Sequence, residues 1–179
     1  AGQLGKISFD IAYGGAFYAL ADASQFGLEF GRDSVAAFVD AADALTRAVQ
    51  AATPLSHPDA EDLAFLYGTI LTDGRDAYSD QPTRNICVFA DRQVDRSPAG
   101  SGVTARLAAM HARGQIAVGR ERIFESIIGS RFSGSIASVT ITGPHEAIIA
   151  NVSGRAFYSG KADFIVEDDD PLAGGFLIR

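Results

Sequence analysis

Hydrophobic and polar residues alternate along the first stretch of the chain. In KISFDIAYGGAFYALADA, Ile7, Phe9 and Ile11 fall on one face of an extended segment. Two consecutive glycines, Gly14 and Gly15, interrupt the alternation. A period of two residues is typical of a half-buried strand, and a glycine pair favours a tight turn. The chain is therefore expected to open with a hairpin.

Two later segments have apolar residues at helical spacing instead. The first runs from Asp33 to Ala51 and ends at a Thr-Pro pair, which stops a helix. The second runs from about Ser101 to Arg113, and Gly114 provides the left-handed residue that commonly ends a helix. Its apolar positions are Val103, Leu107 and Met110. This apolar face predicts that the second helix is a buried central helix.

The remaining apolar runs are short and typical of strands. LAFLYGTIL and NICVFA precede the second helix, and IFESIIG, RFSGSIASVTI, EAIIANV and GRAFYSGKADFIV follow it. The acidic run in EDDDPLAGGFLIR predicts a solvated turn before a last strand. The sequence thus predicts an α+β fold in which strands are in the majority.

Composition limits the kind of partner. The chain has 179 residues, of which 47% are hydrophobic, enough for one domain or two small lobes. A formal net charge of −7 without a cluster of Lys and Arg argues against a nucleic-acid partner. No apolar run approaches the roughly 20 residues of a membrane helix, and a single cysteine excludes an internal disulfide. The start AGQLGKISFD, without Met or a signal-peptide pattern, indicates a cut or processed terminus. A cytoplasmic enzyme or binding protein with a small ligand is expected.

Residues 94–106, VDRSPAGSGVTAR, join a predicted strand to the second helix. After Pro98 the helix begins with Gly100, Ser101 and Gly102. The first N–H groups of a helix have no partner within it and lie at the positive end of its dipole, and glycine lets an anion come close. The pattern therefore indicates a carboxylate site. The alternative is that the glycines only permit a tight turn from strand to helix.

Several long motifs resemble the proline racemase family, which includes hydroxyproline epimerases and trans-3-hydroxyproline dehydratases. They are FDIAYGGAFYA, NICVFADRQVDRSPAGSGVTARLAAMHARG, ESIIGSRFSG and DDPLAGGFLIR, in the family's order along nearly the whole chain. The resemblance implies a diaminopimelate-epimerase-like fold, in which two lobes each wrap strands around a central helix and the site lies between them. It also implies a small imino-acid substrate, proline or hydroxyproline, and no cofactor, and it leaves room for a homodimer.

The same resemblance implies that this chain is the carboxyl-terminal half of such an enzyme. The family's usual chain is nearly twice as long, and its first half carries a catalytic cysteine in a Met-Cys-Gly-His-type motif that these residues lack. Residues 1–115 are then the second lobe. Residues 116–179 are a strand-rich segment that completes this lobe and returns toward the missing amino-terminal half, which is an expected partner. The isolated chain is expected to be inactive.

Ala99 stands where racemases and epimerases of the family have their second catalytic cysteine. Racemisation needs one group to remove the α-proton and another to return a proton from the opposite face, and a methyl group does neither. A dehydratase needs only one base. Dehydratase-like members carry threonine or serine at this position, followed by the sequence GSGVTAR that this chain also has. The preferred interpretation is a trans-3-hydroxy-L-proline dehydratase. Two alternatives stay open: a proline racemase or 4-hydroxyproline 2-epimerase with its cysteine replaced by alanine, and a catalytically silent imino-acid-binding module.

The resemblance also assigns substrate-binding roles. Asp95 is expected to accept a hydrogen bond from the ring nitrogen of the substrate. Gly100 and Ser101 are expected to present backbone N–H groups to its carboxylate. Phe89 is expected to line the pocket against the ring. From the residues alone, Asp95 could instead cap the turn and Phe89 could be an ordinary core aromatic.

Other reactive side chains point to no further site. Cys87 shares a strand face with Phe89, but a lone strand cysteine is usually an inert small hydrophobe. Three scattered histidines lack ligand spacing to one another. They are His57, His111 and His145. Residues 168–170 are three consecutive aspartates that fit a solvated turn better than a cation site. No bound metal is expected.

Overall fold

A single mixed sheet organises the chain. The structure is a computed structural model, and it describes residues 5–176. Seven strands follow one another in the order β1-β2-β3-β4-β6-β7-β8, and the short β5 pairs with β4. The strands are β1 Asp10–Tyr13, β2 Phe17–Asp22, β3 Leu66–Thr72, β4 Thr83–Phe89, β5 Gln93–Val94, β6 Glu121–Ser126, β7 Arg131–Thr142 and β8 His145–Gly154. The helices are α1 Val35–Ala52 and α2 Gly100–Ala112, with 3₁₀ turns at Ala23–Phe26 and Glu61–Leu63.

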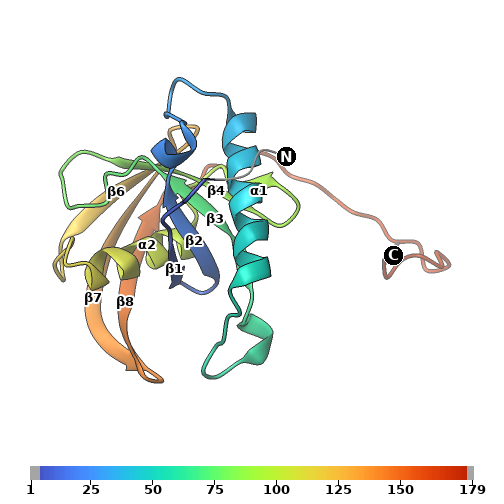
Figure 1. Cartoon of the computed structure of the whole chain (residues 1–179). Helices are drawn as coiled ribbons and strands as arrows, with labels where there is room; N and C mark the ends of the chain where they lie inside the picture. Colours follow the sequence, from blue (N-terminus) through green and yellow to red (C-terminus); the bar gives the residue numbers. More distant parts are fainter. Residues whose placement is uncertain (1–4, 177–179) are drawn as a thin grey trace.

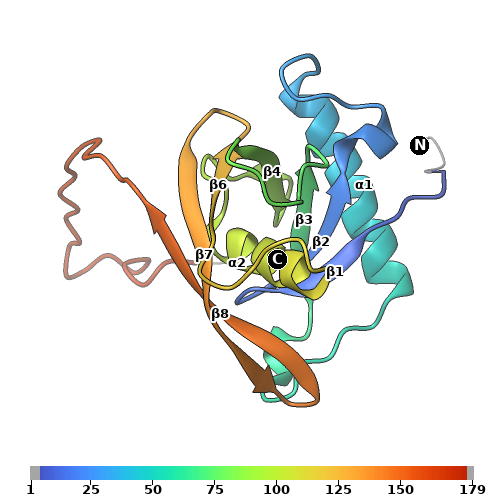
Figure 2. The same cartoon turned by 90° about the vertical axis from the view of Figure 1, so that its left-hand side faces the viewer.

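The two helices lie on opposite faces of the sheet, for a topological reason. β2 and β3 are parallel and α1 connects them, while β4 and β6 are parallel and α2 connects them. Because β3 and β4 are antiparallel, the two crossover units run in opposite directions. Crossovers of the same hand then place their helices on opposite faces. The sheet curls around α2, which lies between its two ends, β1–β2 and β7–β8, whereas α1 covers the outer face (Figures 1 and 2).

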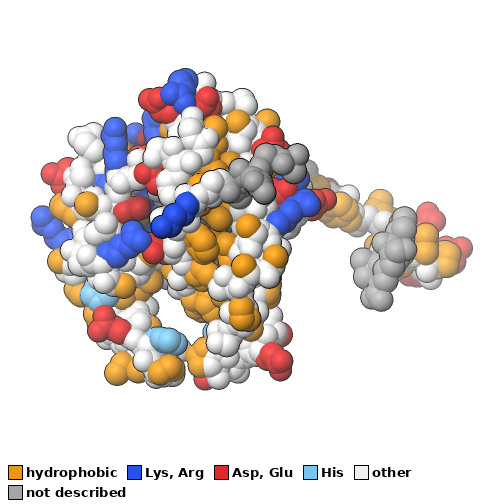
Figure 3. Space-filling view, viewed as in Figure 1, with side chains coloured by type: hydrophobic (Ala, Val, Ile, Leu, Met, Phe, Trp, Pro, Cys, Tyr) orange, Lys and Arg blue, Asp and Glu red, His pale blue; other side chains and the backbone are white. Residues whose placement is uncertain are grey.

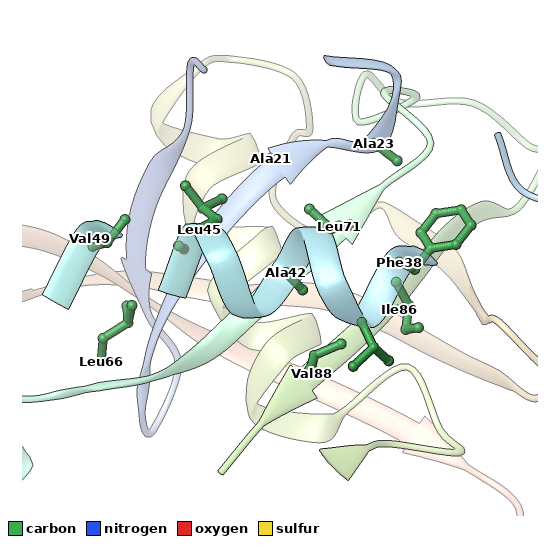
Figure 4. Packing of buried hydrophobic residues seen from close by; sticks show 12 residues of the cluster. Ala21, Ala23, Phe38, Ala42, Leu45, Val49, Leu66, Leu71, Ile86 and Val88 are labelled. Atoms are coloured by element: carbon green, nitrogen blue, oxygen red, sulfur yellow. The ribbon is translucent and has the colours of Figure 1, made fainter. Parts of the chain in front are cut away.

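The outer core confirms the first predicted helix. The Ser34 hydroxyl accepts a hydrogen bond from the N–H of Ala37 at 3.3 Å and caps the helix start. Five buried residues of α1 face the sheet: Phe38, Val39, Ala42, Leu45 and Val49. They pack against side chains of β2, β3 and β4 (Figure 4). The apolar spacing in the sequence is therefore the packing face of α1.

The inner core confirms the second predicted helix. Val103, Leu107 and Met110 are each at most 1% exposed and pack against side chains of β6 and β7. Gly114 has a φ of +66°, which matches the left-handed helix end that the sequence predicts. The opening turn approaches the same helix closely. A Cβ added at Gly14 would lie 2.1 Å from the carbonyl oxygen of Ser101, so only glycine fits there.

The predicted strands agree with the structure up to residue 154 and fail after it. The opening hairpin is β1–β2, and the runs before and after α2 form β3, β4, β6, β7 and β8. The run GRAFYSGKADFIV is not a strand, because the chain after β8 leaves the sheet and pairs with no strand among the described residues (Figure 1). The acidic residues 168–170 are exposed at a turn, as expected. No last strand begins before residue 176, and residues 177–179 lie outside the described part of the chain.

The segment after β8 carries exposed apolar side chains. They are Phe157, Tyr158, Phe164, Ile165, Val166, Leu172 and Phe176. Figure 3 shows hydrophobic side chains along this extension. Within residues 5–176, no helix combines the length and the apolar character that crossing a membrane requires.

Candidate functional site

The first turn of α2 presents unpaired backbone donors. Within the described residues, the N–H groups of Gly100, Ser101 and Gly102 have no acceptor in the protein, and no side chain caps this helix start. These donors lie at the positive end of the helix dipole, where an anion is stabilised. A Cβ added at Gly100 would meet nothing within 4 Å, so the space in front of it is open. The geometry suits a carboxylate.

Ala99 precedes these donors in an unusual backbone conformation. Its φ is +66° and its ψ is 120°, a region that residues with a Cβ rarely adopt. The Ala99 N–H donates to the Ser97 hydroxyl at 3.0 Å, and its carbonyl accepts from the N–H of Val103 at 2.7 Å. Its methyl group is 4% exposed. Strained positions of this kind cluster at functional sites, because the surrounding structure must hold them in place.

Ser101 is held by a tyrosine from a distant part of the chain. The Tyr18 hydroxyl and the Ser101 hydroxyl form a hydrogen bond of 2.8 Å. Tyr18 is 1% exposed, and burial raises the pKa of its hydroxyl to about 12, although the hydrogen bond with Ser101 opposes the shift. The phenol is therefore protonated at neutral pH. Tyr18 is not recognisable as a site residue from the sequence, because its place in an alternating strand marks it only as a core residue.

Asp95 lies in the turn between β5 and α2. One of its carboxylate oxygens accepts from the N–H of Ser97 at 2.7 Å, and its own N–H donates to the carbonyl of Cys87 at 3.0 Å. The first contact shapes the turn, as the alternative interpretation requires. The other carboxylate oxygen has no hydrogen-bond partner among the described residues.

Phe89 ends β4 within a small aromatic group. Its ring stacks on Tyr67 with centroids 5.3 Å apart and an interplanar angle of 12°. Tyr67 in turn meets the edge of Tyr18 at 5.6 Å. Phe89 also packs against the cluster of buried side chains that contains Ala99. The structure thus brings an apolar aromatic surface and the α2 donors to the same end of the sheet.

The other reactive residues stay apart from this arrangement. Cys87 is 1% exposed, and burial raises the pKa of its thiol to about 12, with a further contribution from the charge of Asp95. Such a thiol is not a nucleophile at neutral pH. His57 accepts hydrogen bonds from backbone N–H groups of its own loop, and His111 lies 3.3 Å from Glu146. Within residues 5–176, no three His, Cys, Asp or Glu side chains are placed to share a metal ion.

A hollow lies at the opposite end of the sheet. Its volume is about 730 Å³, and Asp22, Thr72, Arg84 and Glu125 are among its lining residues. Burial raises the pKa of Glu125, but hydrogen bonds from Arg131 and Arg84 outweigh this effect and hold it below its usual range. Glu125 forms ion pairs with both of these arginines. The hollow does not include Ala99 or the start of α2.

The sequence of this chain matches a known protein family and its members. The model of the family described as proline racemase matches residues 1–177. The trans-3-hydroxy-L-proline dehydratase of Homo sapiens is 54% identical over 176 residues, which are 98% of this chain and 50% of that protein. The 3-hydroxyproline 2-epimerase of Burkholderia multivorans is 41% identical over 178 residues, which are 99% of this chain and 52% of that protein.

A solved structure agrees with this placement. A hydroxyproline epimerase from Agrobacterium vitis, with bound trans-4-OH-L-proline, is 33% identical with a TM-score of 0.85 and covers 99% of this chain and 50% of that chain. The chain belongs to the proline racemase family, as its motifs predict. It spans about half the length of the relatives it matches.

Proposed function

We propose that this chain forms one half of the active site of a trans-3-hydroxy-L-proline dehydratase that needs no cofactor. The observation that carries the proposal is Ala99, which has no acid or base at the position where the family's racemases have a thiol. The relatives at 50 to 54% identity are named dehydratases of trans-3-hydroxyproline, which supports the same assignment.

The carboxylate of the substrate binds at the start of α2. The N–H groups of Gly100 and Ser101 donate to it, and the open space before Gly100 lets it approach the main chain. The Tyr18 and Ser101 hydroxyls share a hydrogen bond of 2.8 Å, and with Tyr18 as its donor in this proposal the Ser101 O–H can donate a hydrogen bond to the ligand. Three donors on a rigid element hold the ligand in one orientation.

The ring of the substrate lies beside Asp95 and Phe89. The free carboxylate oxygen of Asp95 accepts a hydrogen bond from the protonated ring nitrogen, while the other oxygen keeps its bond to Ser97. Phe89, backed by Tyr67, provides the apolar surface for the ring carbons.

The reaction needs one base, which the amino-terminal half absent from this chain supplies. That base removes the α-proton, the bond between the β-carbon and its hydroxyl breaks, and the hydroxyl takes a proton from the protonated base or from solvent and leaves as water. The enamine that remains takes a proton from solvent at its β-carbon, loses a proton from the ring nitrogen to solvent, and becomes an imine. Ala99 takes part in no proton transfer, so loss of a thiol there leaves elimination intact but stops two-base racemisation.

The second candidate is an epimerase or racemase that has lost its thiol. The epimerase relative at 41% identity supports it. It differs from the dehydratase in one measurable respect: an enzyme of this kind with alanine at position 99 eliminates no water from trans-3-hydroxy-L-proline.

We further propose the two-lobe, diaminopimelate-epimerase-like architecture for the whole enzyme. Residues 1–115 belong to the second lobe, and residues 116–179 complete it and return toward the first. The exposed apolar side chains after β8, such as Phe157, Phe164 and Ile165, support this placement because they need a partner surface.

The test uses the full-length protein that contains this chain. It is incubated in heavy water with trans-3-hydroxy-L-proline or L-proline, and the α-position and products are followed by NMR. We expect dehydration of the first and no inversion of the second. Inversion of L-proline would refute the one-base argument, and absence of dehydration would favour the epimerase or a binding module.

A glycine variant tests the carboxylate site separately. Gly100→Ala places a methyl group in the open space before the donors without a clash in the chain. We expect a raised KM for trans-3-hydroxy-L-proline, by about tenfold if one charge-assisted hydrogen bond is weakened, and unchanged stability. Gly5→Ala, another glycine with nothing within 4 Å of an added Cβ, is the matched control and should leave KM unchanged.

A further inference from the structure

A buried row of hydrogen bonds links the middle of α2 to the residue before Ala99. The Nη1 of Arg106 donates to the side-chain oxygen of Asn85 at 3.0 Å, and the Nδ2 of Asn85 donates to the carbonyl of Pro98 at 3.2 Å. Arg106 is 1% exposed and Asn85 is fully buried. Arg106 is itself fixed by Thr83 at 2.7 Å and by Asp76 at 2.5 Å.

The chemistry of the partners fixes which way the Asn85 amide points. A guanidinium only donates, so the oxygen of Asn85 must face Arg106. A carbonyl only accepts, so the nitrogen of Asn85 must face Pro98. Asn85 belongs to β4, where it pairs with Thr72 of β3 and Ser126 of β6. The Pro98 carbonyl is therefore tied to the interior of the sheet.

We propose that Asn85 is the positioning residue that keeps Ala99 in its left-handed conformation. Pro98 has no backbone N–H, so its carbonyl is the polar backbone group through which the sheet can hold this residue. The Asn85 bond fixes the peptide between Pro98 and Ala99, and Ala99 in turn sets the direction of the α2 donors. The proposal rests on the proposed function, because the donors it aims are those assigned to the substrate carboxylate.

The alternative is that Asn85 only stabilises the core. A strained residue persists only where its neighbours hold it, whereas glycine reaches the same φ without strain. The two roles therefore differ in how they respond to Ala99→Gly. If Asn85 holds Ala99 in place, replacing Asn85 should have a smaller effect when position 99 is glycine. If Asn85 only supports the core, replacing Asn85 should have the same effect with alanine or glycine at position 99.

The test compares Asn85→Asp with Thr69→Val in the full-length protein that contains this chain. Asn85→Asp keeps the acceptor for Arg106 and loses the donor to Pro98. Thr69→Val removes a part-buried hydrogen bond of 2.8 Å between the fully buried Thr69 and Thr46 on the outer face of the sheet, and it serves as the matched control. Amide chemical shifts of residues 99–102 and L-proline titrations are measured by NMR. Asn85→Asp should shift these amides and weaken L-proline binding about fivefold, and Thr69→Val should do neither.

A double variant separates positioning from stability. Adding Ala99→Gly to Asn85→Asp should restore most of the L-proline affinity, while it changes the thermal stability by no more than Ala99→Gly alone does. Unshifted amides in Asn85→Asp, or equal loss of affinity with and without Ala99→Gly, would overturn the proposal. Asn85→Ala, which adds no charge, replaces Asn85→Asp if the latter does not fold. If the unsubstituted chain gives no L-proline shifts, the proposed carboxylate site fails, and the amide shifts still decide the role of Asn85.

Discussion

Replacing Ala99 with glycine measures the strain at the centre of the candidate site. At a φ of +66° and a ψ of 120°, the backbone strain of a residue with a Cβ costs roughly 1–3 kcal/mol, and glycine avoids this strain. Two effects oppose this gain. The loss of a buried methyl group costs about 0.8 kcal/mol, and the greater entropy of glycine in the unfolded chain costs about 0.5–1 kcal/mol. Ala99→Gly should therefore range from destabilising by about 0.8 kcal/mol to stabilising by about 1.7 kcal/mol.

The matched control is Ala105→Gly in the same helix. Ala105 is fully buried in the interior of α2 and has ordinary helical geometry, so glycine there relieves no strain. It should lose about 0.8 kcal/mol of burial and about 1 kcal/mol of helix propensity. Urea unfolding of the two variants measures the contrast. Equal losses of stability would show that Ala99 carries no strain and would remove the physical basis for a held backbone at this position.

Three further predictions follow from buried groups and close contacts. Burial raises the thiol pKa of Cys87 to about 12 in the folded chain, against about 8.5 in the unfolded chain. The neutral thiol therefore contributes fully to the stability of the folded chain below about pH 8.5. Above that pH the contribution falls by up to about 1.4 kcal/mol per pH unit. Cys87→Ala should flatten the decline in urea midpoint between pH 8.5 and 10, and an unchanged slope would contradict this. Tyr18→Phe should lower stability by about 1 kcal/mol and shift the Ser101 amide in NMR spectra, since it removes their hydrogen bond. Gly14→Ala should cost about 3 kcal/mol or prevent folding, because the added methyl group would lie 2.4 Å from the backbone nitrogen of Ala105, and thermal melting checks it.

Local patterns account for the parts of the fold that the sequence predicted. The face of α2 is visible in the spacing of Val103, Leu107 and Met110, because helical periodicity records which residues are buried. The start of this helix is visible in its glycines. These features depend only on neighbours in the sequence, so a single chain reveals them.

Contacts between distant segments account for what the sequence left out. Tyr18 and Ser101 are 83 residues apart, and only the pairing of β2 within the sheet and the path of α2 bring them together. In the sequence, Asn85 is only one polar residue in a predicted strand. Its proposed role depends on its hydrogen bonds with Arg106 on one side and Pro98 on the other. A positive φ at Ala99 leaves no mark in the sequence, because alanine rarely adopts it.

The failed strand prediction over residues 154–166 has a different cause. GRAFYSGKADFIV has the composition of a strand, but a strand forms only where an edge is available to pair with it. Among the described residues this segment pairs with none, and its apolar side chains are exposed. Composition thus indicates that the segment needs a partner and does not identify which one.

The proposed site separates binding from proton transfer. The proposed donors to the carboxylate are backbone N–H groups of α2, and main-chain donors survive a change of side chain at position 99. The second acid or base of a two-base racemase is, by contrast, a single side chain at that position. One substitution there can remove a proton-transfer step while the substrate still binds in the same orientation, provided that the backbone keeps its left-handed turn. In this proposal both functions of the loop depend on the conformation of Ala99, whose N–H donates to the Ser97 hydroxyl and whose neighbour Pro98 accepts from Asn85.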